Sequence, residues 1–211
     1  MTTTARLPLV RNRLLDCGLL AGPLFVLTFL LEGFFKGDGY SQLRHPVSSL
    51  ALGNNGWIQT ANFLVAGVLT VLFAIGLWRQ ARVAPAPRAH LGAVLVGIWG
   101  VGLLGAGVFT TDPVSGFPLG TPATVEYTTS GALHDAFSLP AFLALAVAMV
   151  VLARGWRLYS LLSAAAFAIT FMLASAGFSQ TGSLVDVGGF FQRLAVIIGW
   201  TWLAALAWRR R

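Results

Sequence analysis

Three short polar stretches carry most of the side chains that could do chemistry in an otherwise apolar chain. They are "RHPVSSLALG" at 44–53, "FTTDPVSGFP" at 109–118 and "TTSGALHDAFS" at 128–138. Together they supply two histidines, two aspartates and several serine and threonine hydroxyls. Imidazole, carboxylate and hydroxyl groups build metal sites and nucleophilic sites, and they also orient polar ligands. Each of these possibilities predicts a different role for the same residues.

The first possibility is a metal-dependent hydrolase. His45, Asp112 and His134 would be the ligands of a zinc-like divalent ion, and Asp135 would orient a ligand or act as a base. The sequence contains no HExxH motif, and Cys17 is its single cysteine. We therefore expect no cofactor and keep a divalent metal as the alternative.

The second possibility is a serine hydrolase that acts on lipid-like molecules. Ser48 or Ser49 would be the nucleophile and His134 the base, and Asp112 or Asp135 would hold the imidazole. No GxSxG motif marks either serine. Because spacing alone is weak support for catalysis, we expect binding rather than an enzymatic reaction.

The third possibility, a site for a lipid or another small amphiphile, is the function that we predict. Ionisable side chains that gather on one side of a membrane protein usually mark a site. The residues predicted to contact the ligand are His45, Trp57, Gln59, Asn62, Thr111, Asp112, Ser138 and Arg193.

A purely structural or accessory role remains the other alternative. Serines and threonines would then cap helices, histidines would donate to carbonyl groups, and Arg193 would neutralise an acid such as Glu32, because polar groups near lipid must be paired. An apolar cleft continuous with the polar residues would favour ligand binding over this structural role.

Asp112 needs a partner in every one of these interpretations. Pro113 ends the preceding helix there, so the carboxylate lies at a helix C-terminus, where the helix dipole disfavours it. The candidate partners are Arg193, His45 and His134. We predict that one cluster contains His45, Asp112, His134 and Asp135.

The composition is that of a membrane protein. Of the 211 residues 56% are hydrophobic and only 10% are charged, which is far from the balance of a soluble domain. The net charge is +7, but the basic residues do not alternate with aromatics along a groove and no nucleic-acid motif is present. We expect membrane lipids, and no nucleic acid, as partners.

Six apolar stretches are long enough to cross a bilayer as helices, the structure that satisfies its own backbone hydrogen bonds in lipid. We predict an all-α, six-helix transmembrane bundle that forms one domain over residues 1–211. The spans are placed at about residues 14–35, 57–78, 91–109, 133–152, 158–178 and 190–208.

Basic residues predict the orientation of these spans. Eleven of the 14 lie before the first span, in alternate connections or after the last span: Arg6, Arg11, Arg13, Arg79, Arg82, Arg88, Arg154, Arg157, Arg209, Arg210 and Arg211. Lys36, Arg44 and Arg193 lie on the other side. By the positive-inside rule both termini are cytoplasmic, and we expect the plasma (inner) membrane.

The first long connection, on the extracytoplasmic side, is predicted to contain a short helix. Pro46 suits the first position of a helix and Gly53 suits the exit, so the segment between them reads as about two turns at the membrane interface. His45 and Ser49, four residues apart, would then share a face.

Small residues predict where the helices pack most closely. The span at 91–109 carries Ala93 with Gly97 and Gly102 with Ala106, at the four-residue spacing that lets backbones approach in lipid. We expect this span at the centre of the bundle. The sequence leaves a homo-oligomer open.

The polar motifs also carry a family resemblance. "HPVSSLALG", "GWIQxxNF", "GVFTTDPVSGFP" and "LHDxFS" in combination resemble a bacterial integral-membrane family known as domain of unknown function number 998. The resemblance extends from about Gly39 to Trp208. It implies a helical membrane fold with several spans, and it implies no reaction and no catalytic residues.

Overall fold

The structure is a computed structural model, and it describes residues 12–37, 39–180 and 182–211. Arg6 and Arg11, which entered the charge count above, lie outside the described residues. The long helices are α1 (Cys17–Phe35), α2 (Trp57–Val83), α3 (Ala89–Val108), α4 (Thr129–Val151), α5 (Arg157–Phe178) and α6 (Gly188–Arg210). Three short 3₁₀ helices accompany them: η1 (Arg13–Asp16), η2 (Ser48–Ala51) and η3 (Val185–Val187).

All six predicted spans are confirmed as helices. Each is long and apolar enough to cross a membrane. The largest difference from prediction is at the end of α2, which continues to Val83 rather than stopping near Trp78. A helix can run past the hydrocarbon core into the head-group layer, where side chains such as Arg79 and Arg82 are solvated.

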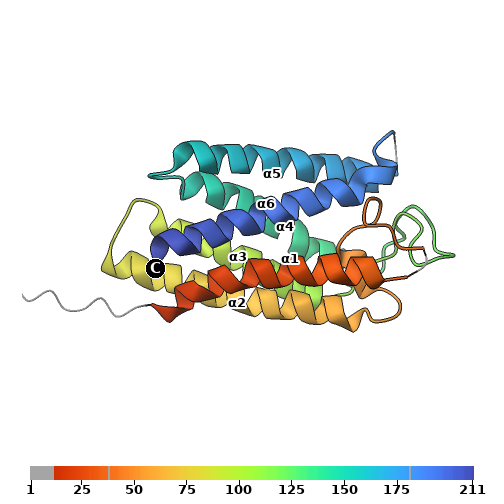
Figure 1. The fold of residues 1–211 in the computed structure, drawn as a ribbon, viewed down its shortest axis with the longest axis horizontal. Helices are drawn as coiled ribbons and strands as arrows, with labels where there is room; N and C mark the ends of the chain where they lie inside the picture. The colour runs from red at the N-terminus through yellow and green to blue at the C-terminus, as the bar shows by residue number, and fades with distance from the viewer. Residues whose placement is uncertain (1–11, 38, 181) are drawn as a thin grey trace, which may run out of the picture.

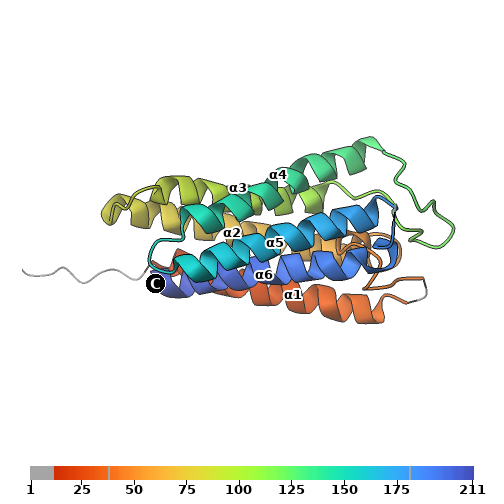
Figure 2. The same cartoon turned by 90° about the horizontal axis from the view of Figure 1, so that it is seen from above.

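The helices follow one another around a closed ring. Each contacts the next in chain order, α6 returns to pack against α1, and the contact between α4 and α5 is the least extensive. Figures 1 and 2 show the connections after α1, α3 and α5 gathered at one end of the bundle. We call this end, formed by residues 36–56, 109–128 and 179–187, the loop end. The connections after α2 and α4 lie at the opposite end with the C-terminus.

Aromatic side chains fill the middle of the ring. The ring centroids of Phe25 and Trp200 are 5.5 Å apart, and those of Trp99 and Trp200 are 5.8 Å apart. These residues come from α1, α3 and α6, so the cluster joins the neighbouring helices α1 and α6 to α3. Between helices in lipid, dispersion contacts of this kind take the place of the hydrophobic effect.

Glycines let α3 pack tightly against both neighbours, and α3 is the most buried of the six spans. A Cβ atom on Gly102 would lie 2.3 Å from the Cβ of Ala141 in α4, so no side chain fits between these helices. A Cβ atom on Gly100 would lie 2.9 Å from the Val71 side chain in α2. The close packing predicted at Gly102 is confirmed, but α3 occupies one position in the ring, between α2 and α4, and does not lie at its centre.

The first connection at the loop end forms less helix than predicted and lies deeper. Only one 3₁₀ turn, η2, is present, because Leu52 is extended and Gly53 has a φ of +66°. The predicted length of two turns is therefore wrong. Ser49 and Leu50 are fully buried, so this segment packs into the loop end of the bundle and does not lie flat on its surface.

Candidate functional site

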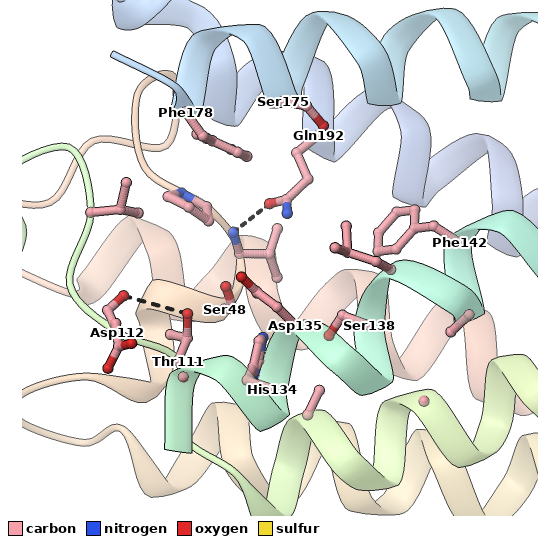
Figure 3. Close-up of a pocket in the computed structure, with 18 of the residues that line it drawn as sticks. Ser48, Thr111, Asp112, His134, Asp135, Ser138, Phe142, Ser175, Phe178 and Gln192 are labelled. Atoms are coloured by element: carbon pink, nitrogen blue, oxygen red, sulfur yellow. Dashed lines mark hydrogen bonds between the residues drawn. The ribbon is translucent and has the colours of Figure 1, made fainter. Parts of the chain in front are cut away.

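A cavity of about 470 Å³ lies within the half of the bundle nearest the loop end, between α3, α4, α5 and α6 (Figure 3). Phe25 of α1, Phe63 of α2 and the first two connections of the loop end complete its walls. Six of the predicted site residues line it: Ser48, Thr111, Asp112, His134, Asp135 and Ser138. The cavity therefore collects side chains from all three polar stretches of the sequence.

The lining changes from polar to apolar with depth. One helical turn separates Ser138 from Phe142 in α4, and one turn separates Gln192 from Val196 in α6. In both helices the apolar residue is the one farther from the loop end. The deepest part is closed by aromatic rings, among them Trp99. The cavity is thus an apolar cleft continuous with the polar residues.

Asp112 holds Thr128, the N-cap residue of α4, and is not paired with a basic residue. Its Oδ2 atom accepts from the Thr128 N–H at 2.8 Å, and its Oδ1 atom accepts from the Thr128 hydroxyl at 2.6 Å. The Thr128 hydroxyl in turn accepts from the Gly131 N–H at the start of α4. The carboxylate lies beside the positive N-terminal end of α4, which compensates for its position at the end of α3. A donor therefore compensates Asp112, as expected of a basic or donor group, but this donor is Thr128 and none of the three candidates Arg193, His45 and His134.

His134 presents one ring nitrogen to the cavity. Its Nδ1 lies 2.8 Å from the Phe109 carbonyl oxygen, and only a protonated nitrogen can bond there. In the neutral ring Nε2 then carries the lone pair, and it has no partner among the described residues. His134 is only 4% exposed and lines the cavity, so in this tautomer Nε2 is an acceptor available to a ligand.

Asp135 lies one residue further along α4, at the rim of the cavity. Its Oδ2 atom accepts from the Tyr127 hydroxyl at 3.3 Å. The nearby Asp135 charge raises the pKa of Tyr127, so the phenol stays protonated and continues to donate. In Figure 3 Asp135 extends from α4 toward the space that Gln192 enters from α6.

Sequence reasoning missed Gln192, which connects α6 to the first connection. Its Oε1 atom accepts from the Val47 N–H at 2.7 Å, and its side-chain amide group lines the cavity. A glutamine in the first turns of an apolar span was the available signal. Sequence reasoning also missed Tyr127 and Ser175. For these two no signal was available, since neither has a local pattern that distinguishes it from other loop or helix residues.

His45 lies behind the cavity wall. Its Nδ1 accepts from the Ser41 N–H at 2.8 Å, and its Nε2 lies 3.2 Å from the Ser115 carbonyl oxygen. Burial lowers the pKa of His45, which favours this neutral, doubly bonded ring. The imidazole thereby joins the first and second connections of the loop end, and it is not among the residues that line the cavity.

The metal hypothesis is contradicted by this arrangement. Across the residues that the structure describes, no group of three histidine, cysteine, aspartate or glutamate side chains is placed to hold an ion. His45 uses both ring nitrogens on backbone groups, and both carboxylate oxygens of Asp112 accept from Thr128. The predicted ligand set of His45, Asp112 and His134 is therefore not formed, and the predicted four-residue cluster lacks His45.

Arg193, like His45, binds neighbouring protein groups and does not line the cavity. Its guanidinium group donates to the His45 carbonyl oxygen at 2.9 Å and to the Tyr40 hydroxyl. Desolvation raises the pKa of Tyr40 to about 12, so this hydroxyl remains neutral. Glu32, the predicted partner of Arg193, instead pairs with Lys36 at 3.4 Å.

The remaining predicted residues lie away from the cavity. Gln59 and Asn62 are buried and bonded to each other, and Asn62 also donates to the Phe25 carbonyl oxygen at 3.1 Å. Ser49 is fully buried, so its hydroxyl is inaccessible to a substrate. Trp57 is 70% exposed, as expected for an aromatic residue at a membrane interface.

The cavity reaches the outer surface of the bundle between α4 and α5. Leu139 of α4 lines the cavity and is 55% exposed, and Ser175 of α5 lines it and is exposed as well. Both lie in membrane-spanning helices, at the least extensive contact of the ring. This opening faces the side of the bundle that a bilayer would surround.

The six apolar helices define a multi-pass integral membrane protein. The chain belongs to the family described as "Protein of unknown function (DUF998)", whose model matches residues 19–209. This confirms the family resemblance of the polar motifs. No curated protein and no solved structure gives a significant match to the chain.

Proposed function

We propose that this protein binds an amphiphile, a lipid or a similar molecule, in the cavity between α3, α4, α5 and α6. The observation that carries the proposal is the continuity of the lining, from Asp135 and Ser138 at the polar end to Phe142 and Trp99 at the apolar end. A volume of about 470 Å³ lies within the range of small-molecule sites, roughly 300–1,000 Å³.

The side opening supports a ligand that arrives from the membrane. An apolar chain can enter between α4 and α5 without leaving hydrocarbon, while its polar head stays at the level of the loop end. The rim residues match this path, since Leu139 is apolar and Ser175 is polar. The site therefore suits a molecule that already resides in a bilayer leaflet.

The orientation belongs to the same proposal. Within the described chain the connections after α2 and α4 carry Arg79, Arg82, Arg88, Arg154 and Arg157 at or near their ends, which supports cytoplasmic termini and an extracytoplasmic loop end. In a Cys17→Ser background, an impermeant maleimide applied to intact cells should label Ala123→Cys and leave Ala84→Cys unlabelled. Labelling with the reverse pattern would invert the topology.

Native mass spectrometry of protein extracted in a mild neutral detergent tests the binding. Wild type is expected to retain a reproducible lipid-sized mass. Ser138→Leu fills the junction between the polar and apolar parts of the cavity and should abolish retention. Ala136→Leu, on the exposed face of the same helix, is the matched control and should retain the ligand as wild type does. Equal retention by Ser138→Leu and the control would place the ligand elsewhere.

Hydrolysis is the second candidate, favoured by the presence of Ser48 and His134 on one cavity. The geometry supports it less well. Among the described residues Ser48 has no hydrogen bond to His134, and Asp135 bonds Tyr127 rather than the imidazole. A nucleophile and its base normally lie within hydrogen-bond reach of each other.

A further inference from the structure

We propose that the head group recognised by this cavity is a cation, an alkylammonium, and not a phosphate or carboxylate. The inference rests on the proposed function and specifies its ligand class. It comes from three features of the polar end of the cavity. The charged side chains that line it are acidic, the nearby basic residues form their hydrogen bonds outside it, and hydrogen-bond acceptors and aromatic rings line it.

The charged side chains that line the cavity are both acidic. They are Asp112 and Asp135, and neither lysine nor arginine is among the described lining residues. Asp112 already accepts two hydrogen bonds from Thr128. Asp135 accepts one, from Tyr127, and so keeps a carboxylate oxygen for a ligand. An opposite charge at this position is attracted, and an anion is repelled.

The described lysine and arginine residues of the loop end, Lys36 and Arg44, and the neighbouring Arg193 of α6 are engaged outside the cavity. Lys36 donates to Glu32 and to the carbonyl oxygens of Leu50 and Asn54. Arg44 pairs with Asp186 on the surface at 3.3 Å. Arg193 donates to the carbonyl oxygen of His45 and the hydroxyl of Tyr40. An anionic head group would thus enter a low-dielectric space with no cation to compensate it, which is costly.

Acceptors and rings suited to an ammonium group line the same cavity as Asp135. Nε2 of His134 is an acceptor in the tautomer that carries its proton on Nδ1, and an ammonium group is a pure donor. The Ser138 hydroxyl, which can also accept, lies on the same wall. Tyr127 and Phe178 add aromatic faces at the polar end, and aromatic rings beside a carboxylate are a recurrent environment for ammonium ligands.

Three probes with the same twelve-carbon chain test the head-group preference: dodecylamine, dodecanol and dodecanoate. Near pH 7 the amine is cationic and the acid anionic, as for lysine and glutamate side chains. Dissociation constants are measured by native mass spectrometry titration of the full chain in neutral detergent. We expect dodecylamine to bind more tightly than dodecanol by about tenfold, a difference of about 1.4 kcal/mol, and dodecanoate to bind most weakly.

Variants separate specific recognition from general attraction to a charged micelle. Asp135→Asn should remove the preference for dodecylamine over dodecanol and preserve dodecanol binding. Asp186→Asn removes an exposed carboxylate at the same end of the molecule and should leave the preference unchanged. Thermal unfolding of each variant verifies that it is folded.

Three results would overturn the inference. If dodecanoate binds wild type as tightly as dodecylamine, or if Asp135→Asn retains the preference, the head group is not selected by this carboxylate while the cavity remains an amphiphile site. If wild type binds none of the three probes and retains no lipid, the proposed function fails together with the inference.

Discussion

Asp112 links the end of α3 to the start of α4 through Thr128. The two hydrogen bonds that it accepts from this residue, at 2.8 and 2.6 Å, fix both the N-cap of α4 and the wall of the cavity. The neighbouring helix start is packed so closely that a Cβ atom on Gly131 would lie 1.9 Å from Oδ2 of Asp112. Asp112 therefore fixes the first turn of α4. His134, in the next turn of this helix, is thereby held at the cavity wall.

Substitution of Asp112 by alanine should destabilise the fold as well as binding. Loss of a charge-assisted cap that leaves donors unpaired costs about 1–3 kcal/mol. Gly131→Ala should also destabilise, because its Cβ collides with the carboxylate. In the double variant the collision is absent, so its loss of thermal stability in detergent should be smaller than the sum of the two single losses. Strict additivity would mean that the two residues do not contact each other.

At the level of elements, the close contact between α3 and α4 limits which side chains fit between these helices. Gly102 and Gly97 lie on the same helix and were both predicted to mark packing faces. The structure separates them: a Cβ on Gly102 would lie 2.3 Å from the Cβ of Ala141, whereas one on Gly97 would lie 3.6 Å from Ala74. Of these two glycines, Gly102 alone is at a contact too tight for a side chain.

These two glycines give a matched pair of substitutions. Gly102→Ala should lower the unfolding temperature in detergent, because α3 and α4 must separate to admit the methyl group. Gly97→Ala adds the same methyl group at ordinary van der Waals distance and should be neutral or slightly stabilising. A similar loss for both variants would contradict the packing described for α3.

The spans could be predicted from the sequence because lipid leaves an apolar stretch few options besides a helix. The same reasoning identified the three polar stretches that meet at the cavity. It failed where a partner is distant in sequence. Nothing local to Asp112 indicates Thr128, and nothing local to His45 indicates the Ser115 carbonyl.

Gln192 illustrates a further limit of sequence reasoning. Its position in the first turns of a span is visible, but its bond to Val47 depends on how the first connection folds into the bundle. Burial of that connection was itself missed, because a proline and two serines are equally typical of an exposed turn. Which polar residues face the cavity is therefore decided by tertiary packing.

At the scale of the whole molecule, the least extensive contact in the helix ring coincides with the opening of the cavity. The helices α1, α2 and α3 form a tightly packed side, and α4 and α5 border the opening. Under the proposed function, the amphiphile exchanges with the membrane between α4 and α5, without unfolding of the bundle. The cationic head group and the apolar chain would then occupy the two ends of the same cavity.

Photolabelling in membranes tests the central claim, that the cavity holds an amphiphile, most directly. A dodecylamine analogue with a diazirine near the chain end is incorporated into vesicles that contain the protein, and attachment sites are mapped by peptide mass spectrometry. We predict labelling of Phe142 and Phe171 inside the cavity, competed by excess unlabelled dodecylamine. Labelling confined to exposed residues such as Leu143 and Leu162, without competition, would contradict the claim.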